Sequence, residues 1–125
     1  MDYDLTVVAE KDSSFAGAVF ALPDANLALR KLNGRVGPVR LLRFMLALRR
    51  LDTVRVMDAV VSPRARGEKM AIAMIARVIE RARQKGFQNV EASWVVEGNE
   101  PSHRTALHFG GRVARRYRVY EKAIK

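Results

Sequence analysis

A basic turn at residues 62–69, SPRARGEK, is the part of this sequence best suited to chemistry. It follows an apolar run, VRVMDAVV, that is typical of a strand, and it leads into a segment with helical periodicity. A strand that enters a helix in this way leaves backbone N–H groups beside the positive end of the helix dipole. The turn therefore predicts a phosphate-binding site, and the structural alternative is a basic surface turn before a helix.

Two carboxylates stand at informative positions of the expected strands. By strand alternation, Asp58 shares a face with the valines of its strand, where burial would raise its pKa and suit it to accept a proton from an amine. Glu97 lies at the end of the next expected strand, on one face with Glu91 and Ser93, while the face with Trp94 is expected to pack under helices. The structural alternatives are a bulge or an arginine partner for Asp58 and a solvated face for Glu97.

Other kinds of catalytic site have little support. His103 and His108 are five residues apart, so they would not share a helix face, and the chain has no cysteine. No metal site is therefore expected. A nucleophilic serine is not expected either, because the Gly-x-Ser-x-Gly elbow is missing from the sequence.

The charge of the chain is strongly positive, with 23 Lys and Arg against 13 Asp and Glu and a formal net charge of +10. Such a surplus attracts phosphates, nucleic acid, anionic lipid or acidic ligands. One basic group consists of Arg40, Arg43 and Arg50, and another lies within residues 112–118. Each group fits either a solvated face or a contact with phosphate, nucleic acid or acidic lipid.

The elements that must position these residues are expected in the order strand, strand, helix, helix, strand, helix, strand, helix, strand. The expected strands cover residues 5–10, 15–22, 54–61, 88–96 and 113–122, and the expected helices cover residues 25–32, 39–50, 67–85 and 101–109. In the third helix, Ile72, Ile75 and Ile79 recur at helical spacing and predict the face laid on the sheet. This order predicts an α/β domain around one sheet.

The 125 residues are expected to form a single domain, since 49% are hydrophobic and 29% are charged. The acidic, strand-like start is unlike a signal peptide, and no apolar run reaches the ~18 residues of a membrane span. A cytoplasmic protein without a membrane partner is therefore expected, and the absence of cysteine agrees with a reducing compartment.

With these elements in place, the chain resembles the GNAT superfamily of N-acetyltransferases. In that superfamily the acetyl-CoA loop has the pattern Arg/Gln-x-x-Gly-x-Gly/Ala between the fourth strand and the third helix, where this chain has RARGEK at residues 64–69. The later segments EASWVVEGN and RRYRVYEK, on either side of a short helix and a Gly-Gly pair, are similar to the closing half of a bacterial subgroup. The resemblance covers most of the chain from about Leu5 onward.

The resemblance implies a mixed, mostly antiparallel sheet flanked by helices, without the usual first strand and two front helices. A sheet face or edge would then lie uncovered, and a homodimer is expected to cover it. The implied cofactor is acetyl-CoA or another acyl-CoA. The residues implied to hold it are Val60, Val61, Arg64, Ala65, Arg66, Gly67, Glu68, Lys69 and Asn99.

The resemblance further implies transfer of an acetyl group to an unidentified amine, with Glu97 or Asp58 as the base. Two positions depart from the family pattern: Lys69 stands where the family has a small residue, and Ala106 stands where many members have a tyrosine that protonates the CoA thiolate. Two alternatives remain open. One is a degenerate GNAT fold that acts as a binding or dimerisation module, and the other is a basic nucleic-acid-binding domain.

Overall fold

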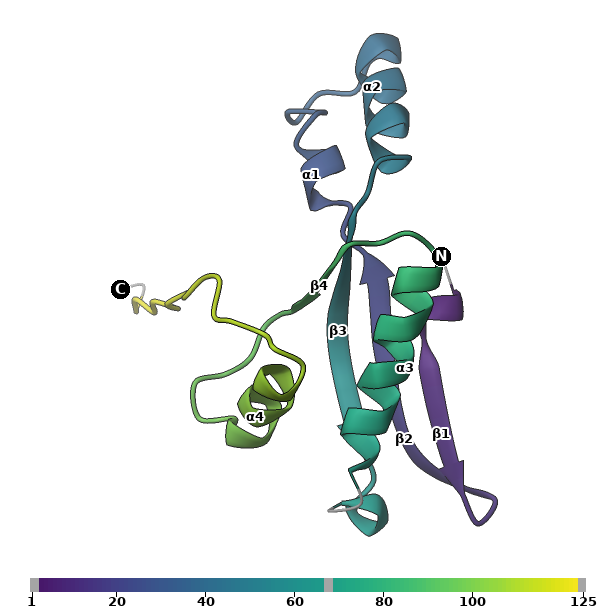
Figure 1. The fold of residues 1–125 in the computed structure, drawn as a ribbon. Helices are drawn as coiled ribbons and strands as arrows, with labels where there is room; N and C mark the ends of the chain where they lie inside the picture. The colour runs from purple at the N-terminus through teal and green to yellow at the C-terminus, as the bar shows by residue number, and fades with distance from the viewer. Residues whose placement is uncertain (1–2, 67–68, 124–125) are drawn as a thin grey trace. The chain divides into compact units, whose positions relative to one another are not determined.

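The computed structural model describes residues 3–66 and 69–123 and divides into two compact units, Met1–Trp94 and Val95–Lys125 (Figure 1). The first unit contains strands β1 (Val7–Lys11), β2 (Ser14–Pro23), β3 (Thr53–Val61) and β4 (Asn89–Ala92), helices α1 (Asn26–Leu29), α2 (Pro38–Leu48) and α3 (Met70–Gln84), and the short 3₁₀ helices η1 (Tyr3–Leu5) and η2 (Pro63–Ala65). The second unit contains α4 (Glu100–His108).

The four strands form one sheet in the order β1-β2-β3-β4. Strands β1, β2 and β3 pair antiparallel, and β4 pairs parallel to β3 after the crossover through α3. The turn between β1 and β2 places Asp12 and Ser13 in the left-handed region, with φ of 51° and 58°, which suits the twist of a two-residue hairpin. The expected mixed, mostly antiparallel sheet flanked by helices is confirmed.

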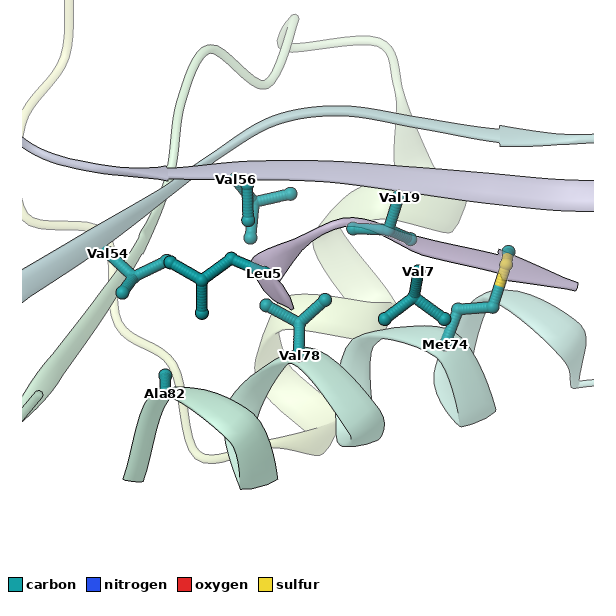
Figure 2. Close-up of a cluster of buried hydrophobic side chains, with 9 residues drawn as sticks. Leu5, Val7, Val19, Val54, Val56, Met74, Val78 and Ala82 are labelled. Carbon is teal, nitrogen blue, oxygen red and sulfur yellow. The ribbon is translucent and has the colours of Figure 1, made fainter. Parts of the chain in front are cut away.

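The hydrophobic core lies between α3 and one face of the sheet. Met74, Val78 and Ala82 follow one another at four-residue spacing along α3, and all three are buried. Figure 2 shows them pointing toward side chains of η1, β1, β2 and β3. Those side chains are Leu5, Val7, Val19, Val54 and Val56. The buried line therefore runs beside the isoleucines that periodicity indicated, of which Ile75 packs against the edge of the core.

Gly17 on β2 lets α3 approach the sheet closely. A Cβ atom at this position would lie 2.7 Å from the Val60 carbonyl oxygen and 2.8 Å from the Met74 methyl carbon. The methionine tip can move, but the carbonyl belongs to the backbone of β3. A side chain at residue 17 would therefore push β2 and β3 out of their present positions.

Replacement of Gly17 by alanine should lower the free energy of unfolding by about 1–3 kcal/mol, the usual cost of overpacking a core. Urea unfolding followed by circular dichroism measures it. The matched control is Gly98→Ala, because a Cβ atom there meets nothing within 4 Å. Equal stability of the two variants would contradict this account of Gly17.

The opposite face of the sheet exposes large apolar side chains. Val8, Phe15, Phe20 and Val60 are between 43% and 59% exposed. Contiguous apolar surface of this kind is usually covered by another element or another protein. An uncovered sheet face is what the family resemblance led us to expect.

The expected strand over residues 113–122 is wrong, because residues 111–123 form neither helix nor strand. Val113, Val119 and Tyr120 are exposed along this segment. A strand is stabilised by pairing with another backbone, and the described part of the unit Val95–Lys125 contains no other strand. The alternating residues of the segment therefore have no sheet to join within that unit.

Candidate functional site

A β-bulge interrupts β3 at Met57. Phe20 of β2 pairs with Asp58, whereas the next residue, Ala21, pairs with Val56, so Met57 has no partner in the register. Residues that pair across antiparallel strands place their side chains on the same face. Val56 therefore shares the core face with buried Ala21, and Asp58 shares the opposite face with half-exposed Phe20.

The expectation that Asp58 lies on the buried face of its strand with Val54 and Val56 is therefore wrong. The extra residue reverses the alternation, so Asp58 is exposed and its Oδ1 accepts a hydrogen bond from the Ala59 backbone N–H at 2.8 Å. Val60 follows Asp58 to the same face and is 43% exposed. The bulge that was the structural alternative for this carboxylate is present, one residue before it.

The pairing between strands β3 and β4 ends next to the bulge. Their parallel register ends at the pair Val56 and Ala92, and the Ser93 N–H reaches the Val56 carbonyl at 3.5 Å. β4 ends there, while β3 continues to Val61 paired with β2. Within the described sheet, residues 57–61 thus have one open backbone edge. Such an edge can pair with the amide groups of an extended ligand.

The early end of β4 corrects a second expectation, which extended this strand to residue 96. Trp94 and Val96 are 83% and 74% exposed, instead of packing under helices. The physical reason lies in β3, because the bulge changes its register where β4 would need to continue. The predicted alternation of Glu91, Ser93 and Glu97 therefore does not extend along one strand.

The basic turn follows the open edge directly. The Ser62 N–H donates to the Ala16 carbonyl at 2.9 Å, and the Ala65 N–H donates to the Ser62 carbonyl at 3.0 Å. Ala65 is buried and anchors the turn, whereas the neighbouring Arg64 and Arg66 are exposed. Two basic side chains are therefore presented at the surface between β3 and the first turn of α3.

The start of α3 favours an anion. Lys69 is its N-cap, and the first turn has no acidic residue among those described. The first backbone N–H groups of a helix have no partner within it, and they carry the positive end of its dipole. Gly67 and Glu68, the other two residues of the predicted loop, lie outside the described residues.

Lys69 itself has a left-handed backbone, with φ 56° and ψ 18°. Glycine adopts this conformation readily, whereas a side chain there meets its own backbone. The loop pattern of the resembled family has a small residue at this position. The departure noted in the sequence is therefore also a conformationally unfavourable choice of residue.

The other two predicted site residues belong to the second unit. Asn99 is the N-cap of α4, where its Oδ1 accepts a hydrogen bond from the Ser102 N–H at 3.3 Å. Glu97 lies in the turn before this helix and is exposed. Within the first unit the structure brings together Asp58, Val60, Val61 and the basic turn. The roles of Glu97 and Asn99 stay predictions.

A polar cluster lies on the sheet face opposite α3, and it joins Glu91 and Ser93, which the sequence placed on one face, to two residues that the sequence did not single out, Asp24 and Arg55. Arg55 of β3 donates from Nη2 to Asp24 Oδ2 at 2.9 Å and to Glu91 Oε2 at 3.2 Å. Its Nε and the hydroxyl of Ser93 are buried without a hydrogen-bond partner. Arg55 shares its face with Asp58, because Leu22 and Phe20 are their respective partners on β2. The signal for Arg55 in the sequence was a cation within an apolar strand.

The pKa of Asp4 is lowered by a contact at the far end of α3. The Lys85 ammonium donates to Asp4 Oδ2 at 2.9 Å, and this hydrogen bond and the accompanying charge attraction favour the carboxylate. Arg81 also donates to the backbone carbonyls of Asp4 and Thr6, at 3.0 Å each. These contacts tie the beginning of the described chain to α3 and leave the basic turn at the other end of the helix.

Among curated proteins, the chain is 29% identical over 130 residues to the bacterial ceramide synthase of Caulobacter vibrioides (strain NA1000 / CB15N), covering 99% of this chain and 34% of that protein. It is 27% identical over 128 residues to Protein YghO of Escherichia coli (strain K12), covering 97% of this chain and 33% of that protein. The chain thus spans about a third of the length of these curated relatives.

Solved structures share the fold. The aminoglycoside acetyltransferase AAC(6')-Iy in complex with a CoA bisubstrate analogue superposes with a TM-score of 0.65 at 18% identity, covering 95% of this chain and 69% of that one. AAC(6')-IG from Acinetobacter haemolyticus gives 0.62 at 17% identity, covering 96% and 70%. The model of the Acetyltransferase (GNAT) family matches residues 2–110, so the chain belongs to the GNAT family of acetyltransferases.

Proposed function

We propose that this chain binds an acyl-CoA and transfers its acyl group to an amine. The observation that carries the proposal is the continuity of two features on β3. An open backbone edge at residues 57–61 leads without a break into the exposed arginines of the basic turn. CoA has the same order of groups, an arm with two amides followed by a pyrophosphate.

The residues take their roles from that order. The backbone at Val60 and Val61 pairs with the amide arm, and the basic turn binds the pyrophosphate. Arg64 and Arg66 supply charge-assisted hydrogen bonds, while buried Ala65 holds the turn in place. The predicted contributions of Gly67 and Glu68 fall outside the described residues, and Asn99 is proposed as a further contact.

The proposed reaction is a direct transfer. The lone pair of a neutral amine attacks the thioester carbonyl, a C–N bond forms, and the C–S bond breaks to release the CoA thiolate. Glu97 or Asp58 accepts the amine proton, directly or through water. A backbone N–H of the open edge holds the developing oxyanion.

The acceptor class that we propose to test first is a long-chain amine. One curated relative is named a bacterial ceramide synthase, and a ceramide is the amide that a long-chain amino alcohol forms with a fatty acid. A long-chain amine and a long-chain acyl-CoA therefore join acetyl-CoA and simple amines among the reactants to test.

Thermal unfolding with and without acyl-CoA tests the proposed cofactor site. A ligand at ~100 times its dissociation constant adds ~2.7 kcal/mol to the free energy of unfolding, which raises the midpoint of this domain by several degrees. The measurement is repeated at high salt to remove non-specific attraction to the basic chain. A shift that survives salt is expected, and no shift with either acetyl-CoA or a long-chain acyl-CoA would contradict the proposal.

The variant Lys69→Gly separates an intact site from a degenerate one. Glycine removes both the side chain near the proposed phosphate site and the unfavourable left-handed lysine. We expect the wild type to show the thermal shift and the variant to show one at least as large. A shift in the variant alone would mean that the natural chain has lost the site and would favour the binding-module alternative.

We also propose that a second copy of the chain covers the open sheet face. The exposed side chains of Phe15 and Phe20 lie on this face, and apolar surface of this kind is commonly buried on dimerisation. Light scattering at micromolar concentration should give the mass of a dimer. A monomeric mass would refute this part of the proposal.

A further inference from the structure

Residues 25–52, which we call the helical arm, are not needed to connect the strands on either side of them. Pro23 pairs with Val54, and the Asp24 N–H donates to the Thr53 carbonyl at 2.8 Å. Antiparallel strands this close can be joined by a turn of two to five residues. The arm instead inserts α1 and α2 between β2 and β3, so it calls for a function of its own.

The arm has its own internal packing. α1 and α2 are in contact, and Arg40 Nη1 donates to the Leu32 carbonyl at 3.0 Å. On the same side of α2, Phe44 and Ala47 are partly buried. Arg40 is therefore a structural residue, and it is not available for the ligand contact that its sequence position suggested.

The rest of α2 exposes a wide apolar surface, and none of its residues is buried. Four apolar side chains lie within an arc of about 120° at 100° per residue, and they form what we call the α2 apolar face. They are Val39, Leu42, Met45 and Leu46, which are 62%, 59%, 52% and 50% exposed. An apolar face that remains in water is costly, so it is expected to be covered.

The charge of the arm indicates what covers it. Residues 26–51 contain seven Lys and Arg and no Asp or Glu. Arg43 and Arg50 lie beside one border of the α2 apolar face, Arg49 lies at its end, and all three are exposed. The covering surface must therefore be apolar and negatively charged together.

We infer that the helical arm docks on an anionic lipid bilayer. α2 would lie in the plane of the headgroups, with its apolar face toward the acyl chains and its arginines at the lipid phosphates. A nucleic acid would engage the arginines and leave the apolar face in water. A bilayer surface satisfies both, which is why we favour it over the nucleic-acid contact considered from the sequence.

This contact is a surface contact and differs from a membrane span. Within residues 3–66 and 69–123, no helix has the length and apolar character to cross a bilayer. The expectation of no membrane partner rested on the lack of such a span, so the present inference replaces it with a peripheral mode of binding. The inference goes beyond the proposed acyl transfer and holds whether or not the acyl-CoA site is active.

The absence of cysteine makes a direct test possible, because a single introduced thiol can be labelled uniquely. Leu46→Cys on the α2 apolar face carries an environment-sensitive dye, and Val119→Cys, at a 91% exposed position in the second unit, is the control. With vesicles that contain about one third phosphatidylglycerol, the Leu46 label should shift to the blue and brighten several-fold. The Val119 label should not change. A silent Leu46 label, or an equal response of both labels, would overturn the inference.

Charge reversals separate docking from general attraction to a basic protein. Arg43→Glu with Arg50→Glu and Arg112→Glu with Arg116→Glu change the net charge equally, since each replaces two exposed arginines. The Arg43 and Arg50 reversal should abolish co-sedimentation with the anionic vesicles, whereas the Arg112 and Arg116 reversal should not. Neither double variant should bind vesicles of phosphatidylcholine alone. Equal loss in both pairs would overturn the inference.

A second copy of the chain is the other occupant that must be tested. Leu42→Glu with Leu46→Glu should abolish vesicle binding while leaving the mass in solution unchanged. If the wild type does not bind vesicles and these substitutions turn a dimer into a monomer, the α2 apolar face is a subunit interface and the inference fails. Circular dichroism of each variant checks that the fold is retained.

Discussion

Replacing Val78 by aspartate should abolish the folded state of the first unit. Val78 is fully buried at the centre of α3, where Figure 2 shows it facing Leu5 and the valines of the sheet. A carboxylate in that place loses its water and gains no partner, which costs several kcal/mol. The free energy of unfolding of a domain is only about 5–15 kcal/mol. This one substitution should therefore remove most of it.

The measurement is urea unfolding followed by circular dichroism, with Val78→Ala as an intermediate step. Alanine should lower the free energy of unfolding by about 2 kcal/mol, through lost burial and the cavity left behind. The matched control is Val119→Asp, because Val119 is 91% exposed. An aspartate variant at position 78 with a wild-type midpoint would mean that α3 does not pack on the sheet as described.

Reversing the charge of Arg64 and Arg66 together should weaken acyl-CoA binding by about a hundredfold or more. Each arginine is exposed beside the start of α3, and a hydrogen bond to a charged group contributes about 1.5–3 kcal/mol. A tenfold change in affinity corresponds to ~1.4 kcal/mol, so loss of both contacts reaches a hundredfold before the added repulsion is counted.

Isothermal titration at fixed ionic strength measures this effect. The pair Arg112→Glu and Arg116→Glu changes the net charge by the same amount and should keep most of the affinity. The ligand offers its own control, because an acyl-pantetheine lacks the pyrophosphate. Its affinity should not change in the Arg64 and Arg66 variant, whereas equal loss for both ligands would place the arginines away from the phosphates.

Patterns in the sequence predicted the elements whose limits are marked by nearby residues, such as turn formers and helix ends. The hairpin, the strand before the basic turn and the following helix were predicted within a few residues. The buried line of α3 was less accurate, because Ile72, Ile75 and Ile79 mark an apolar side of the helix but not the direction from which the sheet approaches. That direction depends on contacts with β1, β2 and β3.

The bulge shows why the candidate site was only partly predictable. Alternation along the sequence placed Asp58 with Val54 and Val56, but its face depends on the pairing of β2 with β3. One unpaired residue, Met57, moves the carboxylate to the other face. The predicted strand at residues 113–122 was wrong for a related reason. Alternation along the sequence does not show whether another backbone lies beside the segment.

The closure between Pro23 and Val54 makes the helical arm a replaceable module. Strands β2 and β3 are already joined at this end of the sheet. The Asp24 N–H donates to the Thr53 carbonyl, and the Asp24 carboxylate pairs with Arg55. Substitutions and length changes within the arm therefore leave the sheet register intact. If the arm docks on lipid and the basic turn binds acyl-CoA as we propose, membrane attachment and acyl transfer can change independently, because the two properties are encoded in separate stretches of chain.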